Sequence, residues 1–185
     1  MKVIGTIGKN GSGKDEVLKY MKRAYGIPFF STGDMVRTIA SKEGVEPTRE
    51  NLREISERYF KKNGEGYFVK LLGEKIKNEQ PDITGISGIR SFSDVNILKN
   101  MFGPDFILIK VDVGNPRLRY ERMVARAEER DPADYEQFLA QDKAEEELFR
   151  LEEASEKADY TVKNDGTLNE LHKAVDELAA KSNIF

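Results

Sequence analysis

Residues 8–14 read Gly8-Lys9-Asn10-Gly11-Ser12-Gly13-Lys14 and fit the spacing G-x-x-x-x-G-K. In such a segment glycines let the backbone curl, so that successive N–H groups and a helix N-terminus bind phosphate oxygens. Lys14 would add a positive charge at the β- and γ-phosphates. The pattern is short, but it directly follows the apolar run 2–7 and opens a helical pattern, as the chemistry requires. We therefore predict a phosphate-binding loop that includes Asp15.

A second candidate group is a series of arginines at three- and four-residue spacing. This spacing places at least three of them on one helical stripe. Arginine stays charged and donates in a planar fork, which suits the charge that develops on a transferring phosphoryl group. The plainer alternative is a solvated face paired with neighbouring glutamates. The arginines are Arg119, Arg122, Arg126 and Arg130, and the glutamates are Glu121, Glu128 and Glu129.

The elements that must position these groups alternate between short apolar runs and helical patterns. This alternation predicts right-handed βαβ units and a parallel sheet covered on both faces. The predicted strands are 2–7, 27–31, 82–89, 106–113 and 160–162. The predicted helices are 14–25, 34–43, one starting at 48, 67–77, 94–101, 115–126, a long charged helix at 136–157, and a last helix containing residues 168–178. We interpret the charged helix as a solvated face rather than a protein-binding surface.

Composition excludes several other classes of protein. The 185 residues predict one domain, 1–185, and contain no cysteine, so there is no disulfide framework or thiolate zinc site. The single histidine, His172, excludes a histidine-rich metal site. A net charge of -3 argues against a general nucleic-acid binder, and no apolar run approaches a membrane span. We expect a cytoplasmic protein without nucleic-acid or membrane partners, and its protein partners stay open.

Four segments resemble small nucleotide kinases, in chain order. Residues 30–37 (FSTGDMVR) resemble the acceptor-site segment of adenylate kinases, and residues 88–90 (GIR) stand where those kinases carry a second phosphate-binding arginine. Residues 121–126 are similar to the helix leading into their lid, and residues 158–167 to their final strand and base-side loop. The chain as a whole resembles a mainly archaeal family related to adenylate kinase and dephospho-CoA kinase, which shares the GSGKD-type loop and the G-I-R-S segment.

The resemblance implies a three-layer α/β P-loop NTPase fold with a five-stranded parallel sheet, and ATP and Mg²⁺ as cofactors. Arg122 and Arg126, with Arg130 at the lid, would reach the transferring phosphoryl group. Asn164 would lie beside the adenine. The lid, residues 127–135, is short and closer in length to that of dephospho-CoA kinase than to long-lid adenylate kinases.

On the acceptor side, the resemblance implies that Thr32 and Arg37 hold the acceptor and that Arg90 clamps the same phosphate. The segment 43–80 would be a helical acceptor-binding insert between the second and third strands. Its aromatic residues could line the acceptor pocket, although their spacing is more typical of core. These aromatic residues are Tyr59, Phe60, Tyr67 and Phe68.

Two positions depart from the pattern beside the expected metal. Asp15 replaces the Ser or Thr that usually follows the lysine and ligates Mg²⁺. Relatives commonly place Asp before the G-I-R segment, where this chain has Ser87. One hypothesis is that the two groups have exchanged places, with Asp15 on the metal and Ser87 hydrogen-bonded to it. The alternative is that Mg²⁺ binds only through phosphates and water.

The residues leave the acceptor open. A nucleoside monophosphate or a similar nucleotide-like small molecule needs no strong base and suits the two acceptor-side arginines. A hydroxyl acceptor, as in dephospho-CoA, must lose a proton, and Asp34 is then the natural general base. Asp34 could instead be a helix N-cap. Beyond a kinase, the irregular metal-side residues also allow a regulatory ATPase that binds nucleotide without kinase turnover.

Overall fold

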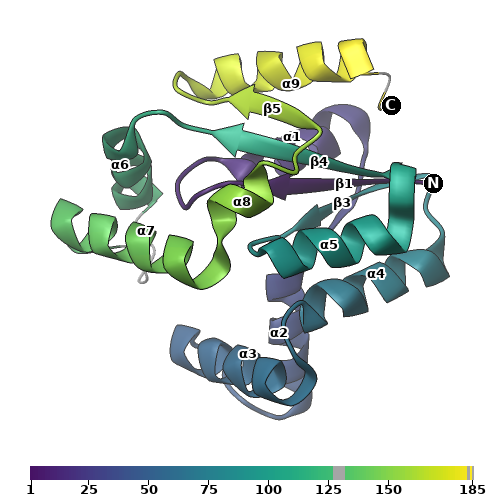
Figure 1. Cartoon of the computed structure of the whole chain (residues 1–185), viewed down its shortest axis with the longest axis vertical. Coiled ribbons are helices and arrows are strands. Elements are labelled where there is room, and N and C mark those ends of the chain that lie inside the picture. The colour runs from purple at the N-terminus through teal and green to yellow at the C-terminus, as the bar shows by residue number, and fades with distance from the viewer. Residues whose placement is uncertain (127–131, 183, 185) are drawn as a thin grey trace.

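The computed structural model describes residues 1–126, 132–182 and 184. Its centre is a five-stranded sheet in the order β2-β3-β1-β4-β5, and every pairing is parallel. All arrowheads therefore point to the same edge of the sheet, at the left of Figure 1, where α6 and α7 lie. The predicted fold class, a parallel α/β sheet covered by helices, is confirmed.

The elements follow the predicted order closely. The strands are β1 (Lys2–Ile7), β2 (Phe29–Ser31), β3 (Ile83–Ser87), β4 (Phe106–Asp112) and β5 (Tyr160–Lys163). The helices are α1 (Lys14–Tyr25), α2 (Thr32–Lys42), α3 (Arg49–Asn63), α4 (Tyr67–Glu79), α5 (Phe92–Phe102), η1 (Gly103–Asp105), α6 (Pro116–Arg126), α7 (Tyr135–Phe149), α8 (Leu151–Ser155) and α9 (Leu168–Ser182).

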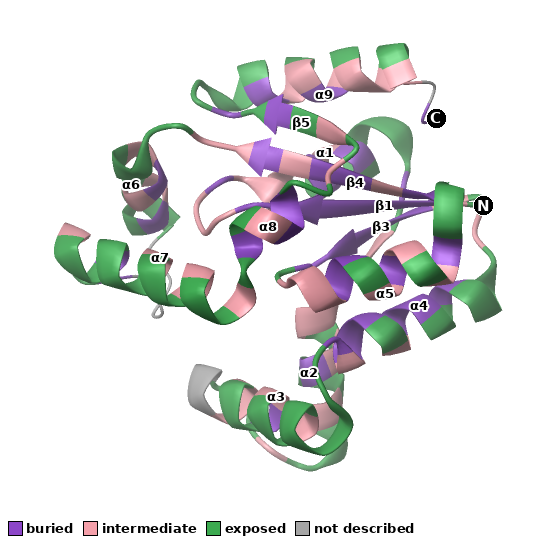
Figure 2. Ribbon diagram, in the orientation of Figure 1, coloured by how far each residue is buried: buried purple, intermediate pink, exposed green. Residues whose placement is uncertain are grey.

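Two hydrophobic clusters fix the sheet between its helices. On one face, Ile4 and Ile109 of the sheet pack with side chains of α1 and α9. On the other face, Val3, Ile86 and Leu108 pack with side chains of α4, α5 and α8. The inner strands β1 and β3 and most of β4 are buried on both faces, as Figure 2 shows by their mainly purple colour, whereas the edge strands β2 and β5 are more exposed. Strands covered on both faces read as continuous apolar runs, which is why the sequence located them.

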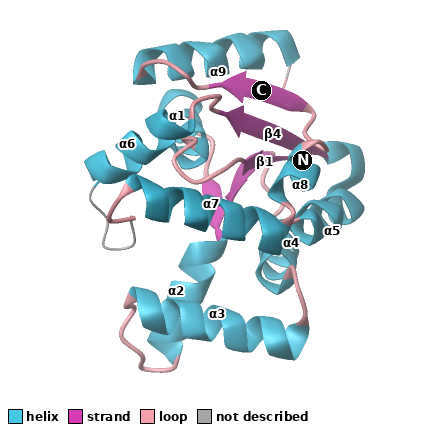
Figure 3. Cartoon of the chain, turned by 60° about the vertical axis from the view of Figure 1, so that its left-hand side comes forward, coloured by secondary structure: helices cyan, strands magenta, loops and turns pink. Residues whose placement is uncertain are grey.

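A third, smaller cluster lies outside these layers. It contains Val36 and Ala40 of α2, Ile55 of α3 and Phe68 of α4. Figure 3 shows α2 leaving the sheet and α3 crossing at the end farthest from it. The aromatic residues of this segment pack mainly on one another: Phe68 is buried, and the rings of Tyr59 and Tyr67 stack at 5.6 Å.

The prediction of one long helix over residues 136–157 is wrong, because the segment is not continuous. It is two helices, α7 and α8, because Arg150 adopts a left-handed conformation with φ 51°. The turn sends Leu151 and Ala154 into the cluster beneath the sheet, and burial of these side chains favours the break. Within α7, Asp142 and Glu145 face the phosphate loop, as described below. None of the helices in the described part of the chain is long and apolar enough to cross a membrane.

Candidate functional site: the phosphate loop and its surroundings

The segment between β1 and α1 forms a tight loop at the carboxyl edge of the sheet. Gly13 caps α1 with φ 87°, a left-handed conformation that favours glycine. A Cβ at this position would also overlap the Asn164 side-chain amide. That amide donates to the carbonyl of Ser12 at 2.8 Å, so the loop is tied to the end of β5. The predicted loop geometry, from strand to helix N-terminus, is thus present.

Lys14 is the cation at the centre of this loop. Its side chain makes no hydrogen bond or ion pair with any residue that the structure describes. Burial lowers the pKa of its ammonium; Asp15 and Glu145 raise it, while Arg90 and Arg126 lower it further. Charges from four elements therefore act on one ammonium. A partly buried ammonium with two arginines in range would suit an anion, and the binding of phosphate here stays a prediction.

Arg119 differs from the other arginines of α6. It is 3% exposed, and its guanidinium donates in a fork to Asp142 of α7, at 2.6 and 2.7 Å. It also donates to the carbonyl of Asn10 at 3.1 Å, and the Asn10 amide donates to Glu145 at 2.7 Å. The expected stripe of phosphate-facing arginines therefore does not include Arg119. This residue binds the phosphate loop to α6 and α7 from behind.

Arg122 lies between α6 and the loop after β5. It donates to the carbonyls of Asn164 at 2.8 Å and Gly166 at 2.9 Å, and more weakly to the Asn164 side chain at 3.3 Å. Asn164 is itself 5% exposed, and its side-chain amide donates to the Ser12 carbonyl. In this structure both residues join the phosphate loop, α6 and the base-side loop. Contact of Arg122 with a phosphoryl group, and of Asn164 with a base, stays a prediction.

The metal-side pair is in contact. Ser87 Oγ donates to Asp15 Oδ1 at 2.6 Å, joining the end of β3 to the first turn of α1. Mg²⁺ typically takes one or two protein carboxylates and completes its shell with phosphate and water. Asp15 fits this donor set, whereas the described residues contain no group of three or more acidic or histidine side chains that would hold a metal alone. The metal role of Asp15 and Ser87 stays a prediction.

The acceptor segment begins α2. Ser31, not Asp34, is the N-cap, since its hydroxyl accepts from the Gly33 N–H at 3.1 Å. Asp34 instead pairs with Arg37 one turn later, at 2.7 Å, and the two side chains are 65% and 55% exposed. Thr32 faces the loop after β3, where its hydroxyl reaches the Gly88 carbonyl at 3.5 Å. The segment offers a hydroxyl, a carboxylate and a guanidinium at the solvent-facing edge.

The last two predicted lid arginines are Arg126, which the structure describes, and Arg130, which it does not. Arg126 is the last residue of α6, and its positive charge lowers the pKa of the Lys14 ammonium. Arg130 and lid residues 127–131 lie outside the described residues. The described part of the predicted lid, residues 132–135, leads into α7, which Asp134 caps by accepting from the Gln137 N–H at 2.8 Å.

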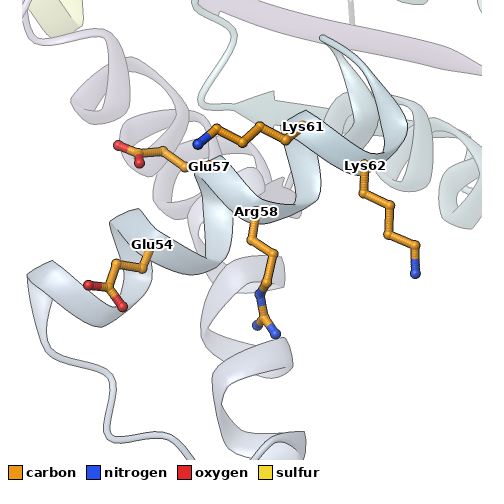
Figure 4. Close-up of a pocket in the computed structure, with 5 residues that line it drawn as sticks. All are labelled: Glu54, Glu57, Arg58, Lys61 and Lys62. Atoms are coloured by element: carbon orange, nitrogen blue, oxygen red, sulfur yellow. The ribbon is translucent and has the colours of Figure 1, made fainter.

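A separate surface depression of about 470 Å³ lies on α3 (Figure 4). Its lining combines two acidic and three basic side chains, and Arg58 is already paired with Glu43 and lies over the Tyr59 ring. It contains none of the predicted site residues, and we assign it no chemistry. The depression is lined by Glu54, Glu57, Arg58, Lys61 and Lys62.

Three residues that shape the site were not found from the sequence: Asp142 and Glu145 beside the phosphate loop, and Asp94 beside Arg90. Asp142 and Glu145 lie three residues apart on α7, one turn of a helix, and this spacing was a signal that both face one side. Nothing in the sequence says that this side meets the phosphate loop. Asp94 follows Ser91 by three residues, which is the spacing of a capping box.

The sheet order, the strand–loop–helix geometry and the cations around Lys14 define a P-loop protein with a kinase-like fold. Solved structures agree: a shikimate kinase from Acinetobacter baumannii in complex with shikimate superposes with a TM-score of 0.63, at 15% identity, over 99% of this chain and 94% of that one. A gluconokinase from Sinorhizobium meliloti does so with a TM-score of 0.58, at 18% identity, over 98% and 95%.

Sequence comparison gives the family. Residues 7–139 match the AAA domain family. The UPF0200 protein of Thermococcus onnurineus is 32% identical over 97% of this chain and 97% of its own length. The UPF0200 protein of Pyrococcus horikoshii is 32% identical over 97% and 96%. The chain belongs to this P-loop family, the UPF0200 proteins, and the predicted resemblance to a mainly archaeal kinase-like family is confirmed.

Proposed function

We propose that this protein is a phosphotransferase that moves the γ-phosphoryl group of ATP to a nucleotide-like small molecule. The observation that carries this proposal is the set of charges around Lys14. Arg90 comes from the acceptor-side loop and Arg126 from the end of α6, yet both act on the same ammonium. A protein that only bound a nucleotide would need the loop and Lys14, but not arginines from both sides.

ATP and Mg²⁺ are the cofactors that these residues fit. Lys14 and the loop N–H groups would hold the β- and γ-phosphates, and Asp15, supported by Ser87, would ligate the metal. When bound, Mg²⁺ would neutralise charge on the phosphates. The negative charges of Asp15 and Glu145 beside Lys14 are otherwise unfavourable for a polyanion, which makes the metal-ligand role of Asp15 the more consistent one.

A phosphate-bearing acceptor is the first candidate. Arg37 lies in α2, directly after β2, and Arg90 lies in the loop after β3, and these two strands are neighbours in the sheet. The Arg37 side chain is paired with Asp34 of the same helix, three residues earlier. Thr32, Arg37 and Arg90 would bind the acceptor phosphate, with Arg122 and Arg126 stabilising the transferring group from the other side.

A hydroxyl acceptor is the second candidate, and the exposed Asp34 carboxylate supports it. Asp34 would accept the hydroxyl proton as general base, while Arg37 bound an anionic group on the same molecule. Two of the solved proteins with this fold are, by name, a shikimate kinase and a gluconokinase. In this case the segment 43–80 would still form the acceptor-binding insert, and residues 127–135 the short lid.

The test is ADP release, coupled to a spectrophotometric readout, with a panel of acceptors. The panel contains nucleoside monophosphates, their deoxy forms, dephospho-CoA, shikimate and gluconate, each with Mg²⁺ and with Mn²⁺. We expect at least one acceptor to stimulate ADP release well above the rate with ATP alone. If none does so with either metal, the phosphotransferase proposal is wrong and the regulatory ATPase becomes the better account.

A further inference from the structure

The loop that carries Arg90 is short and depends on a few anchors. It runs from the end of β3, at Ser87, to the start of α5, at Phe92. Ile89 is fully buried and pins the middle of the loop, while Arg90 itself is exposed. The Arg90 guanidinium makes no hydrogen bond or ion pair with another described residue, so its position depends on its backbone.

That backbone is held by Asp94. One carboxylate oxygen, Asp94 Oδ2, accepts from the N–H of Arg90 at 2.9 Å and from the N–H of Ser91 at 3.0 Å. In return Ser91 Oγ accepts from the Asp94 N–H at 3.1 Å, which completes a capping box at the start of α5. In an ordinary capping box the side chain at N3 accepts from the N-cap amide only. Here the same oxygen also binds the amide of the arginine before it.

Asp94 is 9% exposed, which is unusual for a carboxylate. Burial raises its pKa, against the hydrogen bonds from the Arg90 and Ser91 amides and the positive charge of the Arg90 side chain. The Arg90 charge therefore acts on both Asp94 and Lys14. An exposed cap, such as Glu170 at α9, fulfils the same capping function without this burial.

The acceptor segment contacts the same loop. Gly88 has φ 90°, and a Cβ there would overlap the Thr32 hydroxyl. Thr32 and Gly88 are thus in close contact. The start of α2 therefore packs against the same loop whose backbone carries Arg90.

We propose that Asp94 is a positioning residue that fixes Arg90 on the acceptor side of the site. This inference rests on the proposed function, because it assigns Arg90 to the phosphate or other anionic group of the acceptor. Asp94 does not touch the substrate. It acts through the backbone of Arg90, so its loss should affect acceptor binding before ATP binding.

The experiment compares Asp94→Ala, Asp94→Asn, Arg90→Ala and the double variant Asp94→Ala/Arg90→Ala, with the acceptor identified by the panel. We expect Asp94→Ala to raise the acceptor KM about tenfold or more, with the ATP KM changed by less than about twofold. Asp94→Asn should be milder, because an amide oxygen can still accept from both N–H groups. If Asp94 acts through Arg90, the double variant should be little worse than Arg90→Ala alone.

Glu170→Ala is the matched control, since it removes a carboxylate cap of the same kind at α9. It should leave the acceptor KM within about twofold at saturating ATP. An unchanged acceptor KM in Asp94→Ala, or additive effects in the double variant, would overturn the positioning role.

A second readout does not need activity. Amide exchange of Arg90 and Ser91, followed by NMR, should be slow in the wild-type protein and markedly faster in Asp94→Ala. Equal exchange in the two proteins would overturn the inference. If the wild-type protein transfers phosphate to no acceptor, the proposed function fails, and the exchange measurement alone decides whether Asp94 holds Arg90.

Discussion

The two halves of the candidate site are built differently. In the nucleotide half, formed by the phosphate loop, α6, α7 and the end of β5, polar side chains join elements far apart in the sequence. Arg119 with Asp142, and Asn164 with Ser12, are examples, and both contacts are largely buried. In the acceptor half, formed by α2 to α4 and the loop after β3, Asp34 and Arg37 pair within one exposed turn. The nucleotide half is therefore preorganised, whereas the acceptor half leaves its charged groups in solvent.

This difference suits a phosphotransferase that must hold ATP accurately and admit a second substrate. Groups that are already buried and held by hydrogen bonds need little reorganisation when the phosphates arrive. Exposed charges can lose water and bind an acceptor when it enters. The same difference predicts that substitutions in the two halves will have distinct signatures, one in turnover and stability and the other in acceptor affinity.

The largest effect is expected at Lys14. Lys14→Ala removes the ammonium that we expect to meet the β- and γ-phosphates, and ADP release should fall about 100-fold or more. Lys19→Ala, an exposed lysine later in α1, is the matched control and should keep its activity. Full activity of Lys14→Ala in the coupled assay would refute the phosphate-loop assignment.

The next effect tests the buried clamp behind the loop. Asp142→Ala leaves the Arg119 guanidinium buried without its partner, and we expect the free energy of unfolding to fall by about 3–5 kcal/mol. Asp34→Ala breaks an exposed pair of the acceptor half and should cost less than about 1 kcal/mol. Urea denaturation of both variants measures the contrast. Equal losses would mean that the two halves do not differ in this way.

A smaller effect is expected at Arg37. Arg37→Ala should raise the acceptor KM about tenfold, because a charge-assisted bond to the acceptor is lost, while the ATP KM stays nearly unchanged. Lys42→Ala, an exposed lysine at the other end of α2, should change neither constant. A rise in the ATP KM alone would place Arg37 in the nucleotide half.

The smallest effect concerns stability at the contact between α1 and α9, which we call the seam and which consists of Tyr20, Tyr25 and Asp176. This contact lies next to the nucleotide half. Asp176 accepts from Tyr25 at 2.6 Å and from Tyr20 at 2.8 Å. The bonds from Tyr25 and Tyr20 lower the pKa of Asp176, and the bond to Asp176 raises the pKa of Tyr25 to about 12. The carboxylate therefore contributes stability that is lost as pH falls through its lowered pKa. The tyrosine contributes stability that is lost as pH rises towards 12.

Asp176→Asn should reduce these contributions, so the stability difference from wild type should be greatest between about pH 4 and pH 10. Absorbance titration should show the Tyr25 pKa returning towards about 10 in the variant. A stability difference that does not change with pH would contradict this account of the seam.

The sequence predicted the fold well because its signals are local. Strands buried on both faces appear in the sequence as apolar runs. The phosphate loop is recognised from the spacing of its glycines and lysine and from its position between a strand and a helix. The contacts that shape the site are not local. Arg119 and Asp142 lie 23 residues apart, and no pattern pairs them. The turn at Arg150 contains no glycine or proline, so the break between α7 and α8 could not be read from the sequence.

The same reasoning explains which site predictions remain open. The contact between Ser87 and Asp15 was expected from two exchanged residue types, and it is present at 2.6 Å. Contacts of Arg122 with a phosphoryl group and of Asn164 with a base stay predictions, because both side chains bind other parts of the chain in this structure. These bonds join α6, the base-side loop and the phosphate loop, which lie far apart in the sequence, so residue spacing does not encode them.

The most direct test of the central claim is the fate of the γ-phosphoryl group. ATP labelled at the γ-phosphate is incubated with the wild-type protein, Mg²⁺ and the acceptor that best stimulates ADP release, and the products are separated. The account predicts that the label moves into the acceptor, and that it does so far more slowly in Lys14→Ala and in Arg90→Ala at subsaturating acceptor. Label found only in inorganic phosphate would contradict it and identify an ATPase.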